Sequence, residues 1–345
     1  MKPVRWRLGL LALGFGSLVT GIAAGLARSG LDPLPVGDDA VVLHGAIMVC
    51  GFFGTVISLE RAVALERWWG YAAPLACGLG GLALAAGVPR AGFPSIVIGA
   101  LVLLAASAVF IRRQSNLESW TLASGAACWL MGSTVVALGA PVAAAVPWWL
   151  GFFALTIGGE RLELSRYLPR PRAAQWLFVA IMLSLVAGAG SSLRIVGAAL
   201  SLLAAWLFAY DIARKTVGGK GLTRYMAVCL LAGYAWLALG GALLALGFGY
   251  DAALHSVLVG FVFSMVFGHA PVIVPAVLRR ALPYTPWFYL PLALLHLSLA
   301  VRVAGGLAGE AALRVGGSAG NALAVALFIV TAASRAAYSG RGRMR

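Results

Sequence analysis

The sequence predicts an all-α polytopic membrane protein with about twelve transmembrane helices in three pseudo-threefold four-helix groups. Its composition gives the first reason, because 61% of the 345 residues are hydrophobic, only 11% are charged and the mean hydropathy is +0.94. Apolar runs of about twenty residues, the length that crosses a bilayer, occur from end to end and give the second reason. The third reason is an internal repeat with a period of about 100 residues, which is typical of a repeated structural unit.

The repeat is a short phrase that occurs three times. Its copies begin at Gly51-Phe52, Gly151-Phe152 and Gly260-Phe261, and nine residues after the glycine they carry Glu60, Glu160 and His269. Each copy lies in an apolar run long enough to span a membrane, so the repeating unit is a group of transmembrane helices. We expect a single integral membrane domain over residues 1–345, with pseudo-repeats at 8–111, 119–212 and 225–334.

Hydropathy places the individual spans, with boundaries good to a few residues. They are expected near 8–27, 41–60, 71–89, 94–111, 119–139, 143–160, 174–190, 194–212, 225–247, 252–278, 287–306 and 311–334. The first is interpreted as a permanent helix rather than a removable signal peptide, because it is long and leads directly into further spans.

The basic residues predict the orientation, because Lys and Arg are retained in cytoplasmic loops. With the N terminus inside, all but five of the 26 Lys and Arg residues fall on the cytoplasmic side, including Lys2, Arg343 and Arg345 near the termini. The exceptions are Arg28, Arg90, Arg194, Arg302 and Arg314. We therefore expect a multi-pass protein of the inner (plasma) membrane with both termini in the cytoplasm. Topology and attraction to anionic membrane lipid account for the net charge of +15, so nucleic acid is not an expected partner.

Two of the four histidines have matching positions. His44 and His255 are predicted one turn inside the outer ends of the second and tenth spans. Ionisable groups inside a membrane are costly and are therefore candidates for function, and two neutral imidazoles at equal depth are able to ligate one haem iron from both sides. Arg302, on the outer turns of the eleventh span, would suit a haem propionate. The alternative is that both histidines are interfacial residues bonded to a carbonyl or headgroup, and that Arg302 is a snorkelling anchor.

This layout resembles subunit I of the haem-copper oxidase superfamily, in which histidines on the second and tenth of twelve spans hold the low-spin haem. Local phrases are similar to NnrS-type membrane proteins, a haem- and copper-containing branch linked to nitric-oxide metabolism. These phrases are His44-Gly45-Ala46-Ile47-Met48, Gly158-Gly159-Glu160-Arg161 and Leu254-His255-Ser256-Val257-Leu258-Val259-Gly260. The resemblance implies haem b held by His44 and His255, and a role in electron transfer or in a nitric-oxide-related response. It also implies a redox partner, either a protein or a quinol.

The chain departs from that superfamily at the centre where oxygen is reduced. Oxidases and nitric oxide reductases carry a histidine in the sixth span, a pair in or near the seventh, and a further histidine close to the position of His255. Here no histidine occurs from Pro141 to Ala252. The resemblance therefore implies an electron-transfer haem without the usual binuclear centre, and whether the protein is an enzyme stays open.

The polar positions of the repeat form a second candidate site. Glu60, Glu160 and His269 are expected at matching depth near the cytoplasmic ends of their spans. Two carboxylates and an imidazole could hold a non-haem metal such as iron, manganese or zinc, or could carry protons. In the latter case the protein would be a proton-coupled secondary transporter that uses these three residues. The simplest structural alternative is a set of ion pairs, for example of Glu60 with Arg61 or Arg161.

Helical phase limits how these sites combine. His255 and His269 are fourteen residues apart and would lie within about 40° on one face of a straight helix, whereas His44 and Glu60, sixteen apart, would differ by roughly 160°. The tenth span is thus expected to contribute one residue to the haem site and one to the second candidate site. The second span is not expected to do so. His296, in the middle of the eleventh span, is either a participant at a haem or a hydrogen-bonded core histidine.

Overall fold

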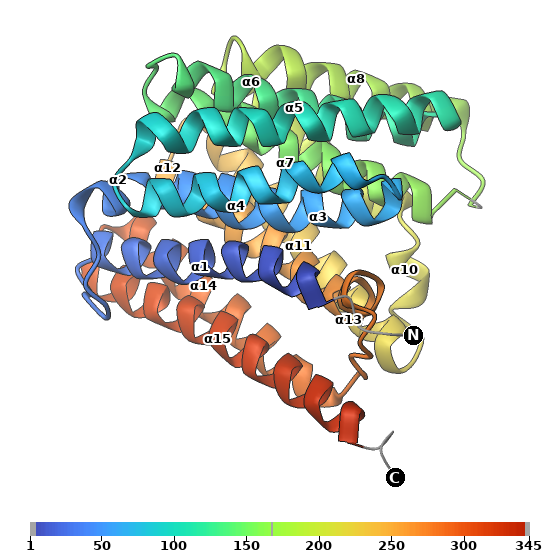
Figure 1. The fold of residues 1–345 in the computed structure, drawn as a ribbon. Coiled ribbons are helices and arrows are strands. Elements are labelled where there is room, and N and C mark those ends of the chain that lie inside the picture. Colours follow the sequence, from blue (N-terminus) through green and yellow to red (C-terminus); the bar gives the residue numbers. More distant parts are fainter. Residues whose placement is uncertain (1–4, 167, 342–345) are drawn as a thin grey trace. The chain divides into compact units, whose positions relative to one another are not determined.

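The computed structural model describes residues 5–166 and 168–341, and within these ranges it contains helices and no strand (Figure 1). By its internal contacts the chain divides into two compact units. We call them the N-terminal unit (residues 2–159) and the C-terminal unit (residues 160–345). Lys2, Arg343 and Arg345, which the sequence assigns to the cytoplasm, lie outside the described residues.

The N-terminal unit contains one helix after another, joined by short loops. Its elements are α1 (Arg5–Arg28), α2 (Asp38–Ala46), η1 (Ile47–Phe53), α3 (Gly54–Leu65), η2 (Trp68–Tyr71), α4 (Ala72–Ala85), α5 (Pro89–Arg113), α6 (Leu117–Ala137) and most of α7 (Val142–Leu164). The elements α2, η1 and α3 form one continuous span. Ring contacts fill the core of this unit, with Phe53 and Phe153 at 5.0 Å and Trp129 stacked on Phe152 at 5.1 Å between centroids.

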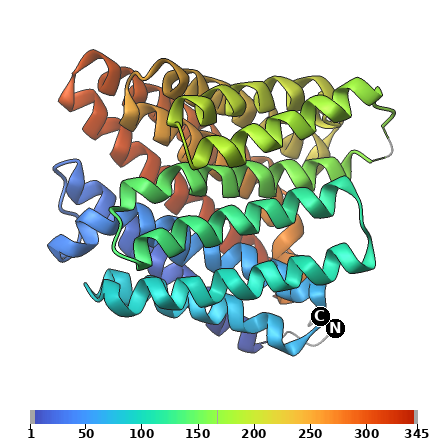
Figure 2. The same cartoon turned by 90° about the horizontal axis from the view of Figure 1, so that it is seen from above.

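The C-terminal unit begins with the last turn of α7 and has a similar order of helices. Its elements are α8 (Arg172–Ala189), α9 (Leu193–Tyr210), α10 (Ala213–Thr216), α11 (Gly221–Leu246), α12 (Tyr250–His255), η3 (Ser256–Phe263), α13 (Ser264–Leu278), η4 (Pro286–Phe288), α14 (Tyr289–Ala308) and α15 (Ala311–Arg341). The last two helices run side by side, as both views of the ribbon show (Figures 1 and 2). Phe267 of α13 stacks on Phe328 of α15 at 4.0 Å between centroids.

Eleven helices in the described residues are long and apolar enough to cross a membrane, which confirms the all-α polytopic fold class. The exception is α4, where the sequence predicts a span over 71–89. This helix has only 14 residues, or about 21 Å of rise, which is less than the roughly 30 Å of a bilayer core. It ends at a turn in which Gly87 has a φ of +72°, so it stops before the predicted boundary.

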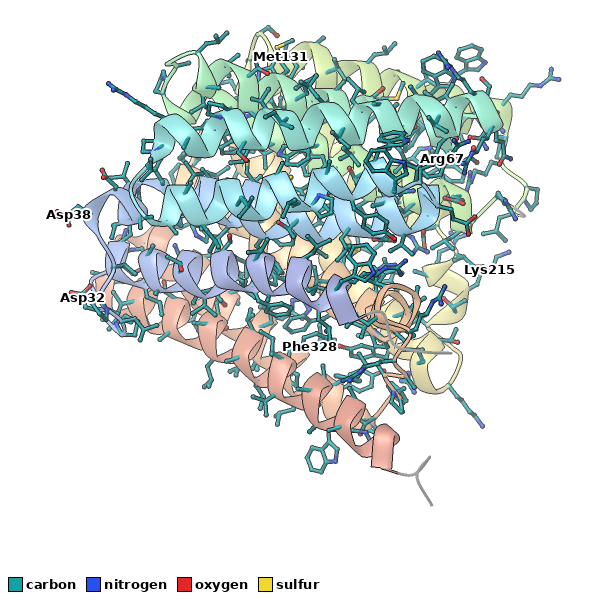
Figure 3. All side chains as sticks on the ribbon, in the orientation of Figure 1. Asp32, Asp38, Arg67, Met131, Lys215 and Phe328 are labelled. Carbon is teal, nitrogen blue, oxygen red and sulfur yellow. The ribbon has the colours of Figure 1, made fainter. Side chains whose placement is uncertain are left out.

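Exposed tryptophans mark one side of each unit. They are Trp6, Trp68 and Trp120 in the N-terminal unit, and Trp176 and Trp287 in the C-terminal unit, each next to a helix end that chain alternation places on the same side. In Figure 3, Arg67 lies at this end of the N-terminal unit and Asp32 at the opposite end. Tryptophan together with arginine is typical of a membrane interface. That this interface faces the cytoplasm stays a prediction.

The glycine of the repeated phrase lies at a helix crossing in all three copies. In each group it faces the first helix: Gly51 faces Ser17 of α1, Gly151 faces Cys128 of α6, and Gly260 faces Trp236 of α11. A Cβ at Gly51 would also lie only 2.8 Å from the backbone Cα of Gly81 on α4. The absence of a side chain thus lets the second helix of each group approach its neighbours, which is a common use of small residues between membrane helices.

Replacing Gly51 by alanine should therefore destabilise the N-terminal unit by about 1–3 kcal/mol, because an added methyl group at a filled crossing forces the backbones apart. Gly45, six residues earlier in the same span, has no atom of another residue within 4 Å of the point where a Cβ would lie. The matched variant Gly45→Ala should be neutral or more stable, because alanine favours a helix over glycine. Thermal unfolding in detergent compares the two variants, and equal unfolding temperatures would show that the crossing is not tight.

Two spans contain a π-helical segment directly after or near a candidate histidine. The segment η1 begins three residues after His44, and η3 begins immediately after His255. A π turn takes in roughly one residue more than an α turn, so it rotates the two halves of a span by about 100° relative to a straight helix. His44 and Glu60 thereby move from roughly 160° apart to roughly 60°, whereas His255 and His269 separate to about 140°.

The expectation that His255 and His269 share one face is therefore wrong. His255 meets Arg302 on α14, and His269 meets Arg161 on α7. This span does not follow a straight α-helix, because the π-helical segment η3 lies between the two histidines.

Candidate functional site

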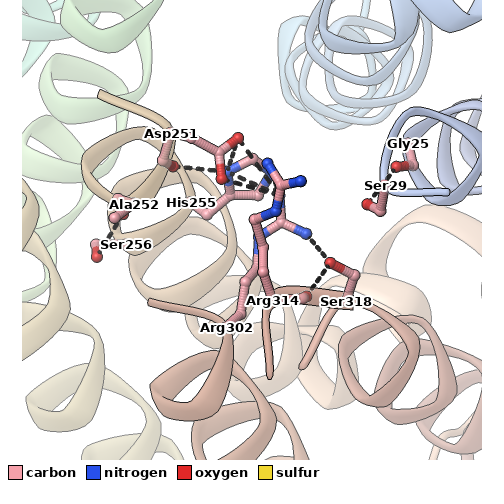
Figure 4. A network of polar contacts seen from close by, with 9 residues as sticks. All are labelled: Gly25, Ser29, Asp251, Ala252, His255, Ser256, Arg302, Arg314 and Ser318. Atoms are coloured by element: carbon pink, nitrogen blue, oxygen red, sulfur yellow. Dashed lines mark hydrogen bonds and ion pairs between the residues drawn. The ribbon is translucent and has the colours of Figure 1, made fainter. Parts of the chain in front are cut away.

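One end of the C-terminal unit, predicted to face outward, holds four polar side chains that we call the outer cluster (Figure 4). Asp251 and His255 come from α12, Arg302 from α14 and Ser318 from α15. Arg302 Nη2 lies 3.0 Å from His255 Nε2 and 3.2 Å from Asp251 Oδ2, and its Nη1 donates to Ser318 Oγ. Arg302 is 9% exposed, so its guanidinium is largely enclosed by protein. Three helices are joined by one buried guanidinium.

The contacts of His255 fix the position of its proton. Nδ1 lies 2.7 Å from the backbone carbonyl of Asp251, which is only an acceptor, so Nδ1 carries the hydrogen and donates it. The guanidinium of Arg302 is only a donor, so Nε2 carries the lone pair. His255 is therefore a neutral imidazole with its proton on Nδ1. Its Nε2 is the nitrogen available to a Lewis acid once Arg302 turns away.

The sequence places these groups by simple spacing. Asp251 and His255 are one helical turn apart, so the carbonyl and carboxylate of Asp251 lie beside the same ring. Gly317 of α15 faces the backbone of Arg302, where a side chain would collide, and the next residue, Ser318, accepts the guanidinium. Arg314 lies within electrostatic reach of Asp251. Two arginines against one carboxylate make the outer cluster attractive to an anionic group.

His44 belongs to the N-terminal unit. It lies near the end of α2, and its ring faces Gly25 of α1, with the Cδ2 atom 3.4 Å from the position of a Cβ on that glycine. The two candidate haem ligands thus come from different units, and the pairing of His44 with His255 stays a prediction.

The opposite end of the C-terminal unit, predicted to face the cytoplasm, holds a second polar cluster, the inner cluster, which is more deeply buried. Arg161 Nε lies 2.8 Å from Asp211 Oδ2, and both residues are 3% exposed. Arg161 Nη1 lies 3.1 Å from His269 Nε2, whose ring donates from Nδ1 to the carbonyl of Met265 at 2.8 Å. Asp211 also accepts hydrogen bonds from Ser165 and from the backbone N–H of Ala213. The arrangement of histidine, arginine and aspartate repeats that of the outer cluster.

Asp211 is a residue that the sequence reasoning missed. It follows α9 directly, lies two residues before α10 and accepts from the first backbone N–H of that helix, so it looks like an ordinary helix-capping aspartate. The available signal was its place at the end of an apolar span, because a carboxylate there requires a partner. The sequence reasoning considered Arg161 as a partner of Glu60, whereas the carboxylate that binds Arg161 in the described contacts is Asp211.

The predicted non-haem metal site has no counterpart among the described contacts. Glu60 belongs to the N-terminal unit, and Glu160 and His269 belong to the C-terminal unit. Within the described part of the chain, no group of three or more His, Cys, Asp or Glu side chains is arranged to hold a metal ion. The three-residue site therefore stays a prediction.

His296 is a hydrogen-bonded core histidine in the middle of the membrane part. Trp236 Nε1 donates to its Nδ1 at 2.9 Å, and Ser264 Oγ lies 3.4 Å from its Nε2. Both partners come from other helices, α11 and α13, so they are distant in the sequence. This is why the sequence neighbours of His296, which are leucines, did not indicate them.

A protein-family model described as "Domain of unknown function (DUF8744)" matches residues 7–337, which is nearly the whole chain. The chain belongs to the DUF8744 family. Neither a curated protein nor a solved structure matches it. The match covers both units and all three pseudo-repeats, so the DUF8744 unit includes the outer and the inner cluster together.

Proposed function

We propose that this DUF8744 protein binds haem b in the membrane through His44 and His255, and that it serves electron transfer or the response to a small gas such as nitric oxide. The observation that carries the proposal is the position of His255 Nδ1, which lies 2.7 Å from the carbonyl oxygen and 3.3 Å from the carboxylate of Asp251. Metal-bound histidines usually donate their other ring N–H to a carbonyl or carboxylate, and His255 has both groups of Asp251 beside Nδ1. Its Nε2 is thereby left as the ligating nitrogen.

The charges of the outer cluster also fit a haem, which carries two carboxylates. Arg302 now donates to Asp251 and to His255 Nε2. Arg302 would have donors for a propionate if His255 Nε2 bound a metal instead, and bidentate pairing with carboxylates is typical of arginine. Arg314 adds a second positive charge. In this proposal His44 and His255 hold the group, Asp251 orients His255, and Arg302 binds a propionate.

A haem held by two histidines supplies one-electron chemistry and has no open coordination position. The proposal therefore favours electron transfer from a quinol or a redox protein over reduction of a substrate. The stretch from Pro141 to Ala252, which contains no histidine, agrees with the absence of the usual binuclear oxygen-reducing centre.

The test is an absorption spectrum of the detergent-solubilised protein from haem-sufficient cells. Wild type should be coloured and show a Soret band, and His44→Ala and His255→Ala should each remove it. His296→Ala is the matched control, because His296 is also a membrane histidine but its nitrogens are engaged by Trp236 and Ser264. The control should keep the band. A colourless wild-type protein, or an unchanged band in His255→Ala, would contradict the proposal.

A further inference from the structure

The inner cluster of Arg161, Asp211 and His269 has no part in the proposed haem site. It is built from elements that are far apart in the sequence: α7, the residue after α9, and α13. Buried charges of this kind require partners but do not by themselves add stability compared with a packed apolar contact. The cluster also contains one histidine, the side chain that changes charge most easily near neutral pH. The inner cluster is therefore a candidate binding site in its own right.

The partners of His269 define its protonation state. Its Nδ1 donates to the carbonyl of Met265, and its Nε2 faces a guanidinium that only donates. His269 is therefore neutral, and its one lone pair is occupied by an N–H of Arg161. A proton can bind at Nε2 only if that N–H withdraws. Arg161 would keep its separate bond to Asp211, because that bond uses Nε rather than Nη1.

Two carboxylates near His269 would partly offset the charge of such a proton. The charged groups that face His269 are Arg161 and Glu160 on α7 and Asp211 after α9. With neutral His269 these groups carry one positive and two negative charges. With His269 protonated they carry two of each, which is the balanced arrangement for a site shielded from water.

A buried phenol lies next to the pair. Tyr234 of α11 is 0% exposed and is within electrostatic reach of both Arg161 and Asp211. Its hydroxyl lies within hydrogen-bonding reach of both of these side chains. A hydroxyl can donate or accept, so Tyr234 offers Arg161 an acceptor when the guanidinium leaves His269. The present arrangement thus already contains the group that the displaced N–H requires.

We propose that the inner cluster is a proton-binding site, in which a proton from water adds to Nε2 of His269 and displaces Arg161 toward Tyr234. An O–H bond of a hydronium ion breaks and leaves water as the N–H bond at Nε2 of His269 forms, so the step needs no other reactant. His269 is only partly buried, and Glu163, one turn after Glu160 on α7, is exposed. His269 is also one of the three residues that the sequence marks for proton coupling. The proposal does not depend on haem binding.

The test follows the four histidine rings by NMR in protein labelled with ¹³C and ¹⁵N at histidine, with signals assigned from single His→Gln variants. As the pH falls from about 8.5 to about 5, the range in which imidazoles titrate, the His269 signals should change from those of a neutral Nδ1–H ring to those of an imidazolium. His296, which faces no charged group in the described contacts, is the internal control and should remain neutral to a lower pH than His269. Each ring is measured in the same sample, so a folding difference cannot produce the contrast.

Arg161 supplies the second arm of the experiment. If its N–H competes with the proton, Arg161→Gln should move the titration of His269 to higher pH by about one unit, since a neighbouring positive charge is removed. Arg161→Lys, which keeps the charge but cannot bridge His269 and Asp211 through a fork, should shift it in the same direction and serves if the glutamine variant does not fold. The proposal is overturned if His269 stays neutral throughout, or if it titrates at the same pH with and without Arg161.

Discussion

Replacement of Arg161 by leucine should destabilise the C-terminal unit by about 3–5 kcal/mol, because it leaves the carboxylate of Asp211 buried without a cation. Both residues are 3% exposed, so water cannot take the place of the guanidinium without a rearrangement. The hydrogen bonds from Ser165 and Ala213 would remain but carry no full positive charge. Unfolding in a denaturing detergent mixture, followed by intrinsic fluorescence, measures the loss.

The double variant Arg161→Leu with Asp211→Leu is the matched control. Removing both charges avoids the unpaired carboxylate, so the double variant should be more stable than Arg161→Leu alone, although it also loses the cap on Ala213. If the single variant unfolds at the same denaturant concentration as wild type, the pair is not buried as described. If the losses of unfolding free energy from the two substitutions simply add, so that the double variant is less stable than Arg161→Leu, the two side chains do not act as a pair.

Hydropathy predicted the fold class and nearly all of the spans, because the length of an apolar run depends directly on the thickness of a bilayer. At α4 the predicted span 71–89 extends beyond the helix, which covers Ala72–Ala85 and follows η2 directly. Gly78, Gly80 and Gly81 are accepted by a hydropathy scale as readily as larger apolar residues, yet here they serve close approach, Gly81 to Gly51 of η1 and Gly80 to Gly92 of α5. A hydropathy scale does not register this use of glycine.

The sites were predictable as residues but only partly as contacts. His255 and Arg302 were both selected because ionisable groups inside a membrane are rare, and the structure brings them together at 3.0 Å. The role of Asp251 did not follow from its position at the start of a span, where an aspartate often serves the helix dipole. His269 was selected by the repeat, but its partners Arg161 and Asp211 depend on helix packing, which the repeat does not encode.

The π-helical segments were not predictable from the residues. The residues of η1 and η3 include β-branched and aromatic side chains and glycine that also suit an α-helix in a membrane, and the equivalent stretch of α7 forms an ordinary α-helix. Segments of this kind often occur at functional sites because they re-aim the side chains on either side. Here they rotate each candidate haem ligand relative to the inner half of its own span.

Deletion of Val259 from η3 should therefore abolish haem binding while leaving a folded membrane protein. Removing one residue converts the π turn to an α turn, so His255 rotates by about 100° relative to α13 and shifts by about 1.5 Å. It would then leave Arg302, which is held in place by Ser318 on α15. The matched control is Val259→Ala, which keeps the length of the span and should keep the Soret band. Circular dichroism and size-exclusion chromatography establish that the deletion variant is folded, and a full Soret band in that folded variant would show that the π segment does not aim His255.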